Sequence, residues 1–265
     1  MPDYGYLKKH IGGVRAAGRY TFTLSGIHAR FPQSAEAIKK ALQRLKNKQE
    51  IVLVRKEFYV IIPPEYSSKG MLPPAMFIDE LMKSLNRDYY VGLQNATAFF
   101  GTVSEPSPGF SVVTTKPPLR AIQAKDQTIS FSSKSEWSNE DIVQMEVETG
   151  YIKVSSPELT ALDLLFFFDK AGGIDRIAIA LEELSYHMDP QKLLTTAKRF
   201  PRITTVQRLG FLLGEILQIQ SLSDPLAEYL KTVNYFPVLL YPEKTRPLRL
   251  TTGNKWKVVQ NVPIG

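Results

Sequence analysis

The 265-residue chain contains no cysteine and only three histidines. Without thiols it can form neither a disulfide bond nor a thiolate metal site. His10, His28 and His187 are isolated, and no His-x-x-x-His pair occurs, so the spacing of ligands does not indicate a metal site. The sequence also lacks the glycine-rich phosphate loops of nucleotide-binding folds. We therefore expect no metal ion and no other cofactor.

Long apolar runs are also missing. The longest one, Leu159 to Phe168, is interrupted by Asp163 and falls short of the ~20 residues that a membrane helix needs. Residues 1–13 lack the apolar core of a secretion signal. The sequence therefore predicts a cytoplasmic protein with no membrane partner. Its 43% hydrophobic and 22% charged residues are ordinary for a globular protein.

Positive charge is concentrated in the first quarter of the chain. Residues 1–63 carry twelve lysines and arginines against four acidic residues, whereas residues 64–265 carry 21 against 22. The formal net charge of +7 therefore belongs to one basic module, followed by a nearly neutral body. A compact basic module most often binds a polyanion, and nucleic acid is the commonest one.

The basic segment has the order of elements of a winged helix-turn-helix. Its periodicity predicts three helices and three strands. The first helix covers residues 4–17, the second runs from a cap at Thr23 or Ser25 to Arg30, and the third covers residues 34–48. The strands are predicted at residues 20–22, 51–55 and 58–62. Ser34 is the predicted N-cap of the third helix. We therefore predict an N-terminal winged helix-turn-helix domain over residues 1–64.

The third helix and the hairpin tip supply the predicted DNA contacts. A helix fits the major groove of B-DNA, where its N-terminal half reaches base edges and flanking cations meet phosphates. The predicted base-reading residues are Gln33, Ser34, Lys39, Lys40 and Gln43. The predicted phosphate contacts are Arg44, Lys46, Lys48, Arg55 and Lys56. Two other interpretations stay open, a merely solvated lysine-rich face and a winged helix that docks a protein.

Paired prolines at positions 63–64 and 73–74 indicate a hinge after the basic module, followed by a C-terminal domain over residues 65–265. Strand-like segments predominate between residues 110 and 154, and helical periodicity between residues 156 and 232. Further extended segments are predicted at residues 237–241, 248–250 and 256–259. The predicted fold class is α+β, with an N-terminal winged helix-turn-helix followed by a larger mixed α/β C-terminal domain.

The C-terminal domain offers no catalytic motif. No G-x-S-x-G elbow occurs, and Asp163 and Asp169 lie six residues apart, which does not favour a shared carboxylate site. Asp163 lies within an apolar helix. We interpret it as a carboxylate that bonds a neighbouring loop or the chain end, because buried carboxylates need partners.

Two segments carry a family resemblance. The basic module runs into Phe58-Tyr59-Val60-Ile61-Ile62-Pro63, and residues 154–165 read Val-Ser-Ser-Pro-Glu-Leu-Thr-Ala-Leu-Asp-Leu-Leu. The second segment is similar to the Ser-Pro-Glu-x-Thr-x-x-Asp-Leu stretch of the AbiEi family, the antitoxins and transcriptional regulators of type IV toxin–antitoxin systems. The order of domains resembles that family over nearly the whole chain. Glu57 stands where relatives often have a glycine before the last strand of the wing.

The resemblance implies a non-enzymatic protein with two activities. The N-terminal domain would bind inverted repeats in the double-stranded DNA of its own promoter and repress transcription. The C-terminal domain would counter a cognate nucleotidyltransferase-like toxin, with or without direct contact. Two alternatives stay open: a nucleic-acid-modifying enzyme with a winged-helix targeting domain, and a winged-helix scaffold for protein interactions.

Overall fold

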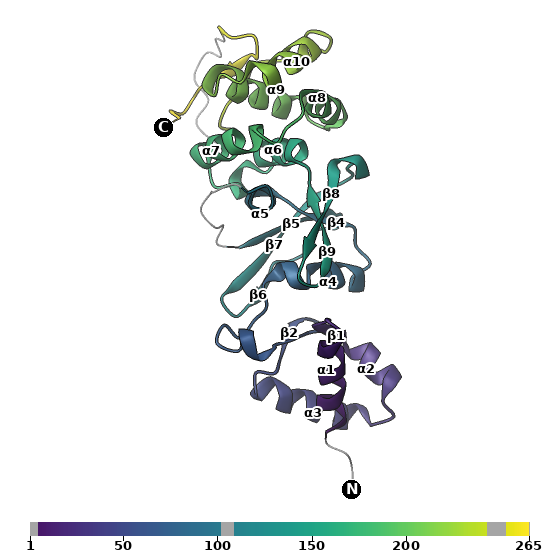
Figure 1. Cartoon of the computed structure of the whole chain (residues 1–265). Helices are drawn as coiled ribbons and strands as arrows, with labels where there is room; N and C mark the ends of the chain where they lie inside the picture. Colours follow the sequence, from purple (N-terminus) through teal and green to yellow (C-terminus); the bar gives the residue numbers. More distant parts are fainter. Residues whose placement is uncertain (1–4, 102–108, 243–252, 265) are drawn as a thin grey trace. The chain divides into compact units, whose positions relative to one another are not determined.

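The computed structural model describes residues 5–101, 109–242 and 253–264 (Figure 1). Its mixture of helices and strands confirms the α+β class. The chain divides into two compact units: unit 1 comprises Met1–Tyr90, Pro108–Lys134 and Gln144–Lys153, and unit 2 comprises Val91–Ser107, Ser135–Val143 and Val154–Gly265. These units interleave along the chain, whereas the predicted domains are contiguous. The predicted boundary after residue 64 therefore stays a prediction.

The basic module folds as three helices and a three-stranded sheet. The helices are α1 (Tyr6–Ala16), α2 (Leu24–Arg30) and α3 (Ala35–Asn47). The strands are β1 (Thr21–Thr23), β2 (Ile51–Arg55) and β3 (Phe58–Ile61), which pair antiparallel in the order β1-β3-β2. Each predicted element of this segment is confirmed to within about two residues, because local patterns determine them.

Local chemistry explains where these elements begin and turn. The side chain of Thr23 accepts a hydrogen bond from the Gly26 backbone N–H at 3.1 Å, and that of Ser34 accepts one from the Ala37 N–H at 3.3 Å. Each of these bonds satisfies a backbone donor in the first turn of α2 or α3. Glu57 has a φ of +66°, a conformation that glycine adopts most readily.

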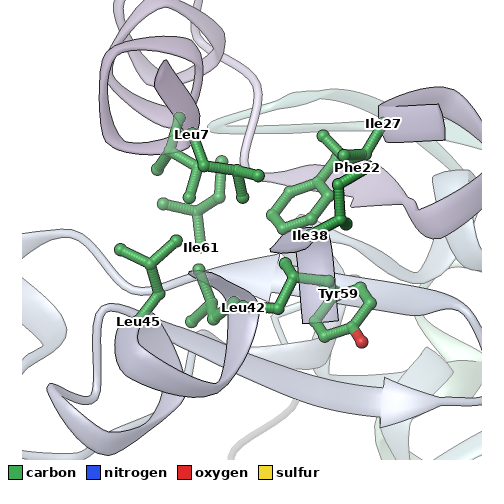
Figure 2. Close-up of a cluster of buried hydrophobic side chains, with 10 residues drawn as sticks. Leu7, Phe22, Ile27, Ile38, Leu42, Leu45, Tyr59 and Ile61 are labelled. Atoms are coloured by element: carbon green, nitrogen blue, oxygen red, sulfur yellow. The ribbon is translucent and has the colours of Figure 1, made fainter. Parts of the chain in front are cut away.

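One hydrophobic core holds the module together (Figure 2). Leu7 comes from α1, Ile38 and Leu42 come from α3, and Tyr59 and Ile61 come from β3; all five side chains are buried. The core therefore fixes the orientation of α3, and the face of α3 that is opposite to the core is presented to solvent.

Six strands between residues 89 and 155 form a sheet in the order β6-β7-β5-β4-β9-β8. They are β4 (Tyr89–Val91), β5 (Phe110–Thr115), β6 (Ile122–Ala124), β7 (Gln127–Lys134), β8 (Ile142–Val147) and β9 (Gly150–Ser155). β5 and β7 are parallel, β6 and β7 are antiparallel, and α4 (Ile78–Ser84) precedes β4. The strands predicted between residues 110 and 154 are confirmed.

Unit 2 is mainly helical. Its helices are α5 (Leu93–Ala98), α6 (Pro157–Phe166), α7 (Ile174–Ser185), α8 (Pro190–Arg199), α9 (Ile203–Phe211), the π-helical segment η5 (Leu212–Ile216) and α10 (Gln220–Lys231). α6 packs against α5, α7, α8 and α9, which explains why its sequence is apolar on all sides.

The C-terminal segments are short. β10 (Val238–Leu239) and β11 (Val258–Val259) pair in parallel and confirm two of the three predicted extended segments in part. The predicted strand at residues 248–250 lies outside the described residues. The α-helical periodicity expected between residues 156 and 232 is interrupted after α9, which passes into the π-helical segment η5.

Candidate nucleic-acid interface

The helix α3 has one apolar and one cationic face. Ile38, Leu42 and Leu45 recur at helical spacing and are buried in the module core. On the other side, the predicted DNA-contacting residues Lys39, Lys40, Gln43 and Arg44 lie away from that core, and Lys39, Lys40 and Arg44 are charged. The structure therefore brings four of the predicted site residues together on one solvent-facing surface, which we call the α3 face.

Two contacts organise the α3 face. Lys40 Nζ lies 2.7 Å from Glu36 Oε1, and Gln43 Nε2 donates a hydrogen bond to Asn47 Oδ1 at 2.8 Å. Both pairs are exposed, and exposed pairs of this kind contribute little to stability. The side chains of Lys40 and Gln43 can therefore exchange these partners for a ligand at small cost.

The ends of α3 hold the next predicted site residues. Ser34 is exposed, but its hydroxyl oxygen caps the helix, so its first role is structural. Gln33 is half-buried, and its Oε1 atom has no hydrogen-bond partner among the described residues. Lys46 is half-buried and Lys48 is exposed. These four positions therefore flank the α3 face and do not lie at its centre.

The hairpin tip carries the last two predicted contacts. Lys56 is exposed, whereas Arg55 is half-buried. The Nη1 atom of Arg55 donates a long hydrogen bond of 3.5 Å to the carbonyl oxygen of Arg120. Arg55 thus already has a hydrogen-bond partner within the chain, and Lys56 is the exposed cation at the hairpin tip.

Five basic residues of the module are not among the predicted DNA contacts. They are Lys8, Lys9, Arg15, Arg19 and Arg30. Arg19 forms an ion pair with Glu80, with 3.2 Å between Arg19 Nε and Glu80 Oε1. Lys8, Lys9 and Arg15 could have been found from their recurrence on the first predicted helix, at positions not used by its apolar stripe, and Arg30 from its place at the end of the second.

The Ser-Pro-Glu segment has a structural role in unit 2. Ser156 Oγ accepts a hydrogen bond from the Leu159 N–H at 3.2 Å and so caps α6. The carboxylate of Glu158, which is 3% exposed, accepts a hydrogen bond from the Asp189 N–H at 3.0 Å. The segment therefore links the start of α6 to the start of α8. Asp163, later on the same helix, is fully buried.

A second polar cluster lies beside this link, at a cavity of about 390 Å³. The buried Asp141 Oδ1 accepts hydrogen bonds from Thr196 Oγ1 and Arg199 Nη2, both at 2.7 Å. Arg199 also pairs with Glu140. Burial lowers the pKa of Arg199, but these hydrogen bonds and ion pairs raise it by more. Arg199 thus binds two carboxylates at once while Thr196 bonds one of them, so the geometry indicates a structural clamp.

Within residues 5–101, 109–242 and 253–264, no group of three or more His, Cys, Asp and Glu side chains is placed to hold a metal ion. No helix in that part of the chain is long and apolar enough to span a bilayer.

One family model matches the middle part of the chain. Residues 90–215 match the family model of the AbiEi antitoxin C-terminal domain. This range contains the Ser-Pro-Glu segment and the Asp141 cluster. No curated protein matches the chain in sequence.

Among solved structures, the crystal structure of the RV2827C protein from Mycobacterium tuberculosis is similar over 99% of this chain and 92% of that chain, with a TM-score of 0.66 and 13% identity. At this identity the likeness concerns the fold alone. An antigenic nucleotidyltransferase-like protein from Paracoccidioides brasiliensis has a TM-score of 0.39 and 13% identity, covering 57% of this chain and 89% of that one. At that TM-score the likeness carries no argument.

Proposed function

Because this chain belongs to the AbiEi family of antitoxins, we propose that it is a non-enzymatic antitoxin that also represses its own transcription. In this proposal a winged helix-turn-helix domain over residues 1–64 binds inverted repeats in the double-stranded DNA of its own promoter. The domain matched over residues 90–215 counters a cognate nucleotidyltransferase-like toxin, in a system that acts in phage defence by abortive infection.

The α3 face is the observation that supports the DNA-binding part of the proposed function. Lys39, Lys40 and Arg44 lie on a helix whose opposite side is fixed in the module core. A helix held in this way loses little conformational freedom when it enters a major groove. The exposed Lys56 at the hairpin tip adds a cation for a backbone phosphate.

Charge reversal on the α3 face tests the DNA-binding half. The triple variant Lys39→Glu, Lys40→Glu, Arg44→Glu should lower the affinity for the promoter at least a hundredfold, because cation–phosphate attraction is replaced by repulsion. In a mobility-shift titration over several salt concentrations, the slope of log K against log salt should fall by about one for each cation–phosphate pair that the variant removes.

A matched triple variant controls for net charge. Lys69, Lys125 and Lys198 are exposed and lie outside the α3 face, so their replacement by Glu makes the same change in net charge. We expect this control to bind the promoter within about threefold of the wild-type protein, since distant charges are screened at physiological salt. Equal losses in the two triple variants would show that the α3 face has no specific role.

The antitoxin half rests on the family match to residues 90–215. Co-expression with a cognate nucleotidyltransferase-like toxin should restore growth that the toxin alone arrests, whereas expression of this chain without a toxin should not change growth. Failure to restore growth at equal protein levels would refute this half. Incubation of the purified chain with nucleotides, Mg²⁺ and tRNA tests the enzymatic alternative, and we expect no modified nucleic acid.

A further inference from the structure

The basic module has a second cationic surface, which is lined by none of the residues of the α3 face. It is a cleft of about 600 Å³ along α1 and the end of α2. We call it the α1 cleft and define it by Tyr6, Lys9, His10, Gly13, Arg30 and Phe31, which line it. None of these residues belongs to the α3 face, and none was assigned a role from the sequence.

The charge of the α1 cleft is of one sign. Lys9, Arg30 and Arg19 line it, and no Asp or Glu does so among the described residues. Arg19 is partly compensated by Glu80, but Lys9 and Arg30 have no acidic partner within 4.0 Å in that part of the chain. Because uncompensated cations in a concave surface focus a positive potential, this cleft favours an anion.

The other wall of the α1 cleft is aromatic. The ring centroids of Tyr6 and Phe31 lie 4.8 Å apart, and the ring of His10 meets Phe31 edge-on at 5.4 Å. The phenolic oxygen of Tyr6 is buried and has no hydrogen-bond partner among the described residues. A buried hydroxyl without a partner is costly, so a side-chain movement that lets it bond a ligand in the cleft would be favourable.

Cations and aromatic rings in one cleft suit a ligand that has both a phosphate and a planar base. The volume lies within the range of small-molecule sites and accommodates a mononucleotide. We propose that the α1 cleft binds a nucleotide, whose phosphate pairs with Lys9 and Arg30 and whose base packs against Tyr6 and Phe31. The nucleotide is either free in solution or an unstacked nucleotide of a bound DNA strand, and both sources present a phosphate together with an exposed base face.

Gly13 provides a sharp test of this proposal. It lies within α1, and a Cβ atom added there meets nothing within 4 Å. The backbone position therefore admits a Cβ atom, Gly13→Leu places an apolar side chain at the lining of the cleft, and leucine favours the helical conformation over glycine. Gly12 is its matched control, because it is also helical with nothing within 4 Å of an added Cβ but does not line the cleft.

The first arm of the experiment measures binding of free nucleotides to the full chain by titration calorimetry, using AMP, GMP, CMP and UMP. We expect at least one to bind, and Gly13→Leu or Arg30→Gln to weaken it at least tenfold, whereas Gly12→Leu stays within about twofold. Inorganic phosphate, and the nucleoside that lacks the phosphate, should each bind at least tenfold more weakly than the nucleotide that binds. Equal binding of inorganic phosphate would refute the aromatic half of the site.

The second arm measures promoter DNA in a mobility shift. If no free nucleotide binds but Gly13→Leu weakens DNA binding at least tenfold and Gly12→Leu does not, the nucleotide belongs to the DNA strand. If the two glycine variants behave alike in both arms, the proposal is wrong. The free-nucleotide arm does not require DNA binding, so it can succeed or fail independently of the proposed function.

A spectroscopic readout supports both arms. Burial and the charge of Arg30 lower the pKa of His10. A phosphate bound beside Arg30 offsets that charge and should raise the pKa of His10, as followed by the imidazole proton signals of the three histidines during an NMR titration. The pKa of His10 in Gly13→Leu should not respond to the nucleotide, and an equal response there would contradict the assigned site.

Discussion

At the scale of the residue, Glu57 adopts an unusual backbone conformation. Its φ is +66° at the two-residue turn between β2 and β3. For residues other than glycine this left-handed region costs roughly 1–2 kcal/mol. Glu57 thus holds a backbone conformation that glycine would adopt without this cost.

Replacing Glu57 by glycine should therefore stabilise the protein. We expect Glu57→Gly to raise the free energy of unfolding by up to ~1 kcal/mol, because relief of strain exceeds the extra entropy of the unfolded chain. Lys56, the other turn residue, is not among the positive-φ positions, so Lys56→Gly should lower the stability by ~0.5–1 kcal/mol. Denaturant titration of both variants would measure this, and changes of the same sign would contradict the explanation.

At the scale of the element, α9 and the C-terminal segment show how a glycine permits close packing. Trp256 is fully buried, and its ring lies directly over Gly210, where an added Cβ atom would overlap it. The indole N–H donates to Glu215 Oε1 at 3.0 Å, and Gln207 Nε2 donates to the carbonyl oxygen of Trp256 at 2.9 Å. The C-terminal segment is thereby held on α9 by packing and by two hydrogen bonds.

Gly210→Ala should separate Trp256 from α9. We expect a loss of about 3 kcal/mol, or roughly 6–12 °C in Tm, because the core must shift to admit one methyl group. Gly214→Ala should lose less, since its Cβ would lie at 3.1–3.2 Å from its nearest neighbours. Gly253→Ala, with nothing within 4 Å, should stay within about 0.5 kcal/mol of the wild-type protein. Thermal unfolding of the series tests this order, and equal losses would refute it.

At the scale of the whole molecule, the two proposed activities map to different parts of the chain. The excess positive charge lies in residues 1–63, whereas the family match covers residues 90–215. The α3-face triple variant, expressed from an unrelated promoter, should therefore still restore growth in the presence of the toxin while it no longer shifts promoter DNA. Loss of growth rescue at wild-type protein levels would show that toxin neutralisation needs the DNA-binding face.

Local sequence patterns predicted the elements well. The buried stripe of α3, with Ile38, Leu42 and Leu45, follows from helical spacing, and the cap residue Ser34 follows from hydroxyl chemistry at the start of a helix. The π-helical segment after α9 escaped prediction, because it adds a residue to a turn without changing the apolar pattern. Helical periodicity predicted which DNA-contact positions on α3 are exposed. It could not predict that Arg55 donates a hydrogen bond to the carbonyl oxygen of Arg120.

The sequence by itself determined where the charge lies, where helices and strands begin, and which side of α3 is apolar, because each of these depends on neighbours within a few residues. Only the tertiary structure decided the strand order β6-β7-β5-β4-β9-β8, the fit of Trp256 on Gly210 and the lining of the α1 cleft. These features join residues from separate elements, and their positions follow from how buried surfaces pack together, which no local pattern encodes.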